Sequence, residues 1–120
     1  MMFISTRGAA PAVSLSQAIA AGLAPDGGLY VPQTLPPART LQAGATLADT
    51  ATTLLQPFFE GDALAGELAA ICAEAFDFPA PLVPLATPGD YALELFHGPT
   101  AAFKDSVSYT HLTLPTILLV

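Results

Sequence analysis

The chain has 120 residues, enough for one small domain and too few for most cofactor-dependent enzymes. The chain has ten acidic residues and three basic ones, Arg7, Arg39 and Lys104. The resulting net charge of −7 argues against binding to nucleic acids or anionic membranes. The apolar runs fall short of the ~20 residues of a membrane helix, whereas 52% hydrophobic residues favour a packed domain over disorder.

The first third of the chain predicts two short strands around one helix, at residues 2–6, 15–21 and 29–31. Ser14 is placed to cap the start of the helix, and Gly22 is placed where a C-cap glycine belongs. The intervening Pro-Asp-Gly-Gly predicts a tight turn, because glycine adopts positive φ without steric cost.

Two more helices are predicted between residues 46 and 77, with Thr46 capping the first and Gly61-Asp62 separating them. The apolar face of the second includes Leu64. Each has apolar residues at helical spacing, so we expect the helices to pack antiparallel around one core. The expected core residues are Leu54, Phe58, Leu68, Ile71, Cys72 and Phe76.

Three prolines, Pro79, Pro81 and Pro84, predict a loop after the helices. The alternating residues Tyr91–Phe96 then predict a half-buried strand, which continues directly into residues 97–105.

Lys104 is the only lysine in the chain and follows Ala101, Ala102 and Phe103. An apolar setting disfavours the ammonium form and lowers a lysine pKa, as the formation of an imine with an aldehyde requires. A lone surface lysine in an alanine-rich acidic protein is the competing interpretation, and composition does not separate the two.

The residues around Lys104 resemble a known signature. The run Glu94–Asp105 reads ELFHGPTAAFKD and is similar to the ELFHGPT-x-AFKD signature of threonine synthases, with Ala101 at the variable position. The segments at residues 4–8 and 22–32 resemble the opening of the same family, in the same order. Residues 76–81 resemble its link to the cofactor domain.

This resemblance implies a fold-type II pyridoxal phosphate enzyme, a lyase of threonine biosynthesis. Such an enzyme converts O-phospho-L-homoserine and water to L-threonine and phosphate. It implies that Lys104 binds the cofactor covalently and, once displaced by the substrate amine, moves protons at the substrate α and β carbons. The groups of the family that hold the cofactor phosphate and ring come later in the sequence, so we expect this chain alone to be inactive.

The resemblance also implies a division of the chain. Residues 1–79 would be the N-terminal domain of a threonine synthase, and residues 80–105 the truncated start of the cofactor domain. The fold expected for the chain is α+β: a helical segment with a few short strands, lacking the parallel sheet of the whole enzyme.

Residues 106–120 depart from the family, which continues there as a helix. Val107–Thr116 reads VSYTHLTLPT, which resembles one translated frame of a transposase-derived sequencing adapter. We therefore expect a non-native tail that does not pack with the domain.

Other residues and functions stay open. Cys72 is the single cysteine, which excludes an internal disulfide, and the N-terminus MMFISTRG lacks a signal-peptide pattern, so we expect a cytoplasmic location. His97 is either a ligand-binding or a structural histidine, and Arg7 and Asp105 have no assigned role. No metal-ligand cluster is expected.

Two alternative functions remain. The first is a threonine synthase-like phospholyase acting on a different phosphorylated amine. The second is a small non-catalytic protein with an aromatic interaction surface made of Phe58, Phe59, Phe76 and Phe78.

Overall fold

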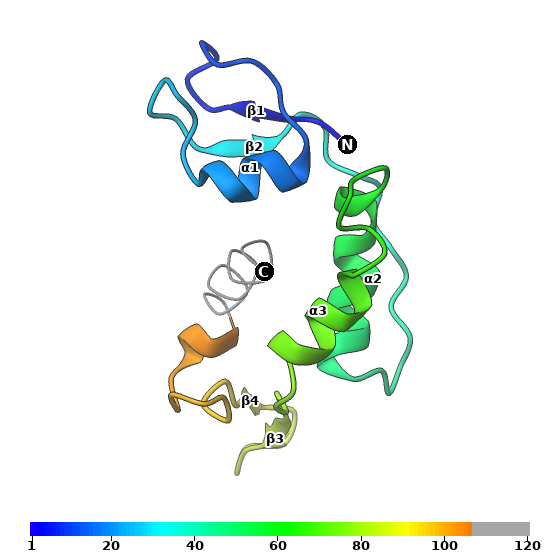
Figure 1. Ribbon diagram of the computed structural model, residues 1–120. Coiled ribbons are helices and arrows are strands. Elements are labelled where there is room, and N and C mark those ends of the chain that lie inside the picture. Colours follow the sequence, from blue (N-terminus) through cyan, green and yellow to red (C-terminus); the bar gives the residue numbers. More distant parts are fainter. Residues whose placement is uncertain (107–120) are drawn as a thin grey trace.

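The computed structural model describes residues 1–106, which form three α-helices, four short strands and one 3₁₀ helix. The strands make two separate antiparallel pairs, β1 with β2 and β3 with β4. This mixture confirms the predicted α+β class (Figure 1). In chain order the elements are β1 (Phe3–Ser5), α1 (Leu15–Ala21), β2 (Tyr30–Pro32), α2 (Leu47–Phe59), α3 (Leu68–Ala75), β3 (Leu82–Pro84), β4 (Tyr91–Leu93) and the 3₁₀ helix η1 (Phe103–Ser106).

The N-terminal unit is the β1–β2 pair with α1 beside it (Figure 1). Phe3 lies opposite Pro32 and Ser5 opposite Tyr30. Phe3 also exchanges two backbone hydrogen bonds of 2.9 Å with Val13, which holds the segment before α1 against β1. Both predicted strands are confirmed, although β1 is shorter than expected and β2 begins later.

Local capping signals set the starts of α1 and α2. The Ser14 hydroxyl accepts the Gln17 N–H at 3.3 Å, and the Gln17 side chain accepts the Ser14 N–H at 3.0 Å. Thr46 and Asp49 make the same reciprocal pair at α2, and α1 ends at Gly22 with φ 70°. Such capping boxes satisfy backbone donors that have no partner within the helix. The predicted caps are confirmed.

A partly buried carboxylate network closes the turn between α1 and β2. Asp26 accepts hydrogen bonds from the Ser5 hydroxyl at 2.7 Å, the Gly28 N–H at 2.9 Å, and the Ala9 and Ala10 N–H groups at 3.0 Å each. The Ser5 and Gly28 bonds, followed by those of Ala9 and Ala10, lower the pKa of Asp26 despite desolvation.

The same network explains two residues of the opening motif. A Cβ on Gly28 would lie 2.1 Å from the Ser5 Oγ, so a larger residue has no room there. Arg7 donates its backbone N–H to Ser5 and its Nη1 to the Asp26 carbonyl, at 3.1 and 3.2 Å. These contacts support the structural interpretation of Arg7.

The connection between α2 and α3 is longer than predicted. The chain turns at Gly61, which has φ 75°, and α3 begins at Leu68. The Asp62 carboxylate accepts a hydrogen bond from the Leu64 N–H at 3.0 Å, which stabilises the turns of this segment. The expected position of Leu64 within the second helix is therefore wrong.

Asp62 also joins the helical hairpin to the N-terminal unit. Its Oδ2 accepts the N–H of Ser16 at 3.0 Å and the Ser16 hydroxyl at 3.1 Å. Nearby, the ammonium group of Met1 donates to the Glu60 carbonyl at 2.8 Å. These contacts fix α1 and β1 against the turn that ends α2.

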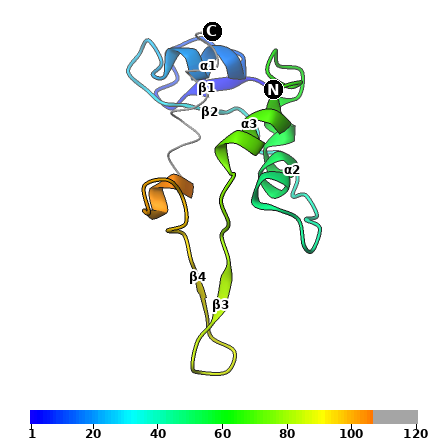
Figure 2. The same ribbon diagram turned by 60° about the horizontal axis from the view of Figure 1, so that its bottom comes forward.

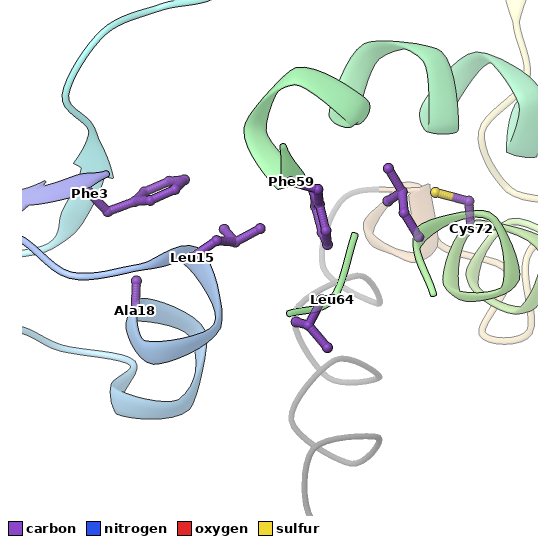
Figure 3. Close-up of a cluster of buried hydrophobic side chains, with 7 residues drawn as sticks. Phe3, Leu15, Ala18, Phe59, Leu64 and Cys72 are labelled. Atoms are coloured by element: carbon purple, nitrogen blue, oxygen red, sulfur yellow. The ribbon is translucent and has the colours of Figure 1, made fainter. Parts of the chain in front are cut away.

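The core lies where α1, α2 and α3 meet β1. Figure 3 shows Phe3, Leu15, Phe59 and Leu64 converging in this space. The predicted packing of α2 against α3 is confirmed (Figure 1), with Leu68, Ile71 and Cys72 buried. Phe58 and Phe76 contribute at the edge of the core.

Leu54 is a correction to the predicted core, because it is 44% exposed. It lines an apolar cavity of about 500 Å³, whose other walls include Ile19 and Phe58. The helical pattern places Leu54 on the apolar face of α2, where it lines this cavity and remains exposed to solvent.

The aromatic interaction surface is also wrong as a set. Phe59 and Phe78 are buried, while Phe58 and Phe76 are partly buried against the core. Helical spacing does not distinguish a core ring from a surface ring here.

After α3 the chain forms an arm, the β3–β4 hairpin, which extends away from the helices (Figure 2). Leu82 pairs with Leu93, and Pro84 with Tyr91. β3 lies where the prolines predicted a loop, and β4 ends at Leu93 instead of continuing to residue 96. Tyr91 and Leu93 are exposed, which contradicts the expected half-buried strand.

Candidate functional site

Lys104 lies in η1, at the end of the described chain, and its side chain is exposed. Ala101, Ala102 and Phe103 are exposed as well. The apolar setting expected for Lys104 is therefore absent from residues 1–106, because adjacent apolar residues in sequence do not cover the amine. An exposed amine is accessible to an aldehyde. The desolvation of the Lys104 amine has to come from groups other than Ala101, Ala102 and Phe103.

The loop before Lys104 is held by the next residue, Asp105, which is 1% exposed. Its Oδ2 accepts the Thr100 N–H at 2.8 Å, and its Oδ1 accepts the Thr100 hydroxyl at 2.6 Å. The Thr100 hydroxyl, with smaller contributions from the Thr100 and Ala102 N–H groups, lowers the pKa of Asp105 despite burial. The Asp105 carboxylate is thus ionised and has both oxygens occupied.

His97 contacts Glu94 rather than Lys104. The His97 Nε2 lies 2.7 Å from the Glu94 Oε2, three residues earlier, and its ring stacks at 4.6 Å on Phe96. Both polar side chains are partly exposed. These local contacts support the structural interpretation of His97.

The described residues lack other features that would suggest a different site. Residues 1–106 contain no group of three or more metal-ligating side chains. In the same range no helix is long and apolar enough to cross a membrane.

Comparison with known proteins identifies the family. The family model described as "Threonine synthase N terminus" matches residues 2–76. The chain belongs to the threonine synthase family. It is 42% identical over 115 residues to a threonine synthase of Pseudomonas aeruginosa, covering 88% of this chain and 24% of that protein. A threonine synthase of Haemophilus influenzae is 39% identical, over 78% of this chain and 22% of its own length.

Solved threonine synthases have the same fold in this region. The pyridoxal phosphate-bound enzyme of Brucella melitensis superposes with a TM-score of 0.80 at 37% identity, over 99% of this chain and 27% of that one. The Escherichia coli enzyme has the same TM-score at 28% identity. The chain therefore spans about a quarter of the length of its relatives and corresponds to the N-terminal part of a threonine synthase.

The geometry adds two residues that the sequence interpretation did not single out. Thr100 supplies both donors to Asp105, and Gly98 packs directly against the Asp105 side chain. The signal in the sequence was an acid that follows a Gly-Pro-Thr turn. Residues of an irregular loop have no periodic spacing, so the sequence does not show which of them bind each other.

The predicted tail stays a prediction. Residues 107–120, including the adapter-like segment, lie outside the described residues.

Proposed function

We propose that the protein containing this chain is a threonine synthase, a cytoplasmic lyase that converts O-phospho-L-homoserine and water to L-threonine and phosphate. The observation that supports it most directly is Lys104. It is the chain's only lysine, it is exposed, and it follows a well-defined loop in a chain of the threonine synthase family. We assign residues 1–79 to the N-terminal domain and residues 80–105 to the start of the cofactor domain.

The described residues fit pyridoxal phosphate in part. The exposed Lys104 amine suits a covalent bond to the cofactor aldehyde. Residues 1–106 offer no glycine-rich loop after Lys104 to hold the phosphate, so the rest of the protein has to provide it. When bound, the cofactor supplies an electron sink for the substrate.

In this proposal Lys104 has two roles. It binds the cofactor at rest, and its free amine then accepts and returns protons at the substrate α and β carbons. Burial disfavours the charged form of an amine, so cover from the remaining protein would favour the neutral Lys104 amine that can act as a base. The chain on its own should therefore lack activity.

The test is a chimera in which residues 1–105 replace the matching segment of the Pseudomonas aeruginosa relative. The intact chimera should show the absorbance band of lysine-bound cofactor and release phosphate from O-phospho-L-homoserine. Lys104→Ala should lose both, whereas Arg39→Ala, which removes a cation from an exposed loop, should lose neither. Unchanged turnover in Lys104→Ala refutes the assignment.

The phospholyase alternative has some support of its own. The chain is 39% identical over 114 residues to a protein of Pongo abelii named "Threonine synthase-like 2". The chimera carries the downstream part of its host, so it does not resolve this point. The parent protein, expressed with its own downstream sequence, should consume O-phospho-L-homoserine; turnover of a different phosphorylated amine alone favours the alternative.

A further inference from the structure

We propose that Asp105 is a positioning residue for Lys104, and that it acts by clamping Thr100 across the loop of residues 98–105. The proposal rests on the proposed role of Lys104 as the cofactor lysine. It assigns a task to an acid that the proposed reaction does not otherwise use.

Both oxygens of the Asp105 carboxylate take part in the clamp. Both carboxylate oxygens of Asp105 bind donors of Thr100, at 2.8 and 2.6 Å. Two backbone bonds tighten the same loop, from the Ala101 N–H to the Gly98 carbonyl at 3.0 Å and from the Asp105 N–H to the Ala102 carbonyl at 3.1 Å. Charge-assisted bonds of this length are stronger than neutral ones, so the loop has one preferred conformation.

The backbone is shaped around the carboxylate. A Cβ on Gly98 would lie 2.4 Å from the Asp105 Cβ and 2.6 Å from its Oδ2. Ala101 has φ 56°, a conformation that a residue with a side chain adopts only when its surroundings impose it. Gly98 provides the space and Ala101 bears the strain, which indicates that the buried position of Asp105 is a strong constraint.

This constraint directs the neighbouring lysine. Successive side chains of a 3₁₀ helix point about 120° apart, since the helix has about three residues per turn. Because Asp105 is held inward, Lys104 has to project away from the loop, as its exposure shows. Within residues 1–106 the carboxylate binds Thr100 and makes no ion pair with the adjacent ammonium, so it does not act as a counter-ion.

A misplaced lysine would affect the reaction more than substrate binding. A displacement of about 1 Å at a reacting group can lower a rate by about 10²-fold. We therefore expect the clamp to influence kcat and the geometry of the bound cofactor, with little effect on KM.

The test uses the full-length chimera described above. Asp105→Ala should lower kcat by about 10²-fold and reduce the circular dichroism of the cofactor band, with KM nearly unchanged. Gly98→Ala should reproduce this result, because its added Cβ displaces the Asp105 side chain. The double variant should be no worse than either single one, since the side chain that Gly98→Ala displaces is then already absent. Thr100→Ser keeps both donors and should retain activity and spectrum.

Matched controls are Asp90→Ala, an exposed acid, and Gly66→Ala, a glycine with open space at its Cβ position. Neither should change the cofactor band. If Asp105→Ala does not fold, Thr100→Val decides, since it removes the 2.6 Å bond and keeps the Thr100 N–H. Wild-type kcat and dichroism in Thr100→Val, or in a folded Asp105→Ala, overturn the proposal. Retention of the cofactor band in Lys104→Ala instead refutes the proposed function beneath it.

Discussion

Every buried hydrophobic residue of the described chain lies within residues 1–78, whereas residues 80–106 contain none. The buried apolar residues run from Phe3 to Phe78 and belong to β1, the three helices and their connections. In the arm, Leu82, Leu93 and Phe96 are exposed, and Phe103 beside Lys104 is exposed as well. Two short strands without a third element rarely form a stable unit in water. We therefore expect the arm to depend on other parts of the protein, while the first region has a core of its own.

The two regions have different places in the proposed function. The region with its own core contains the whole match to the family's N-terminal model, at residues 2–76. The segment that follows the arm carries Lys104 and the clamp. A threonine synthase would thus place its cofactor lysine on a segment that gains its packing from the larger domain. The following predictions test the contrast between the two regions.

The largest effect is expected for Leu68→Ala. Leu68 is 3% exposed at the start of α3, so truncation leaves a cavity and should cost about 2–5 kcal/mol of unfolding free energy. Urea denaturation of the chain, followed by far-ultraviolet circular dichroism, measures it. A loss below about 1 kcal/mol would mean that the two helices are loosely packed.

Asp62→Ala should come next. The change leaves the Ser16 and Leu64 N–H groups without their acceptor and should cost about 1–3 kcal/mol. The matched control is Asp77→Ala, an exposed acid after α3. Equal midpoints for the two variants in the same urea titration would contradict the role of Asp62 in joining α1 to the helical hairpin.

The pH dependence of stability should follow the same carboxylate. Burial alone would raise the pKa of Asp62, but the bonds from Ser16 and Leu64 outweigh it, and the pKa lies below its usual value of 3.8. A lowered folded-state pKa stabilises the protein above pH 3.8, and this stabilisation is lost as the pH falls through the folded-state pKa. Urea midpoints measured from pH 6 to 2 should therefore decline less in Asp62→Asn than in the wild type. An identical decline would exclude Asp62 as a contributor.

A smaller loss, about 1 kcal/mol, is expected for Thr46→Ala, which removes the N-cap of α2. Thr46→Ser keeps the hydroxyl and should restore most of the stability. Thermal unfolding of both variants is the measurement. If serine is no better than alanine, the reciprocal bond with Asp49 does not stabilise the helix.

The smallest effect is expected in the arm. Leu93→Ser removes an exposed side chain from β4 and should change the unfolding free energy of the chain by less than about 0.5 kcal/mol. In the full-length chimera the same change should be more costly, because the arm would then be covered. Equal effects in both proteins would contradict the dependence of the arm on the larger domain.

Features fixed by neighbouring residues could be predicted from the sequence. The caps at Ser14 and Thr46, the end of α1 at Gly22 and the apolar face of α3 all follow from contacts within a few positions. The α+β class followed from the family resemblance, since the other elements are short and irregular.

Features that depend on distant partners were missed. Leu64 lies in turns before α3, where Asp62 binds both the Leu64 N–H and Ser16, which is 46 positions away. Leu54 lines a cavity and is exposed, and helical spacing carries no information about how closely a neighbouring element covers a residue. The clamp between Thr100 and Asp105 depends on a positive φ at Ala101. An alanine in the sequence does not predict a positive φ. The position of Lys104 in the signature could be found from sequence, but its exposure could not.

The solitary exposed lysine has a practical consequence for labelling chemistry. Reagents that modify primary amines have two targets in this chain, the Lys104 side chain and the α-amino group of Met1, which is hydrogen-bonded to Glu60. A fluorophore attached at Lys104 would report from the loop itself, without any cysteine being introduced.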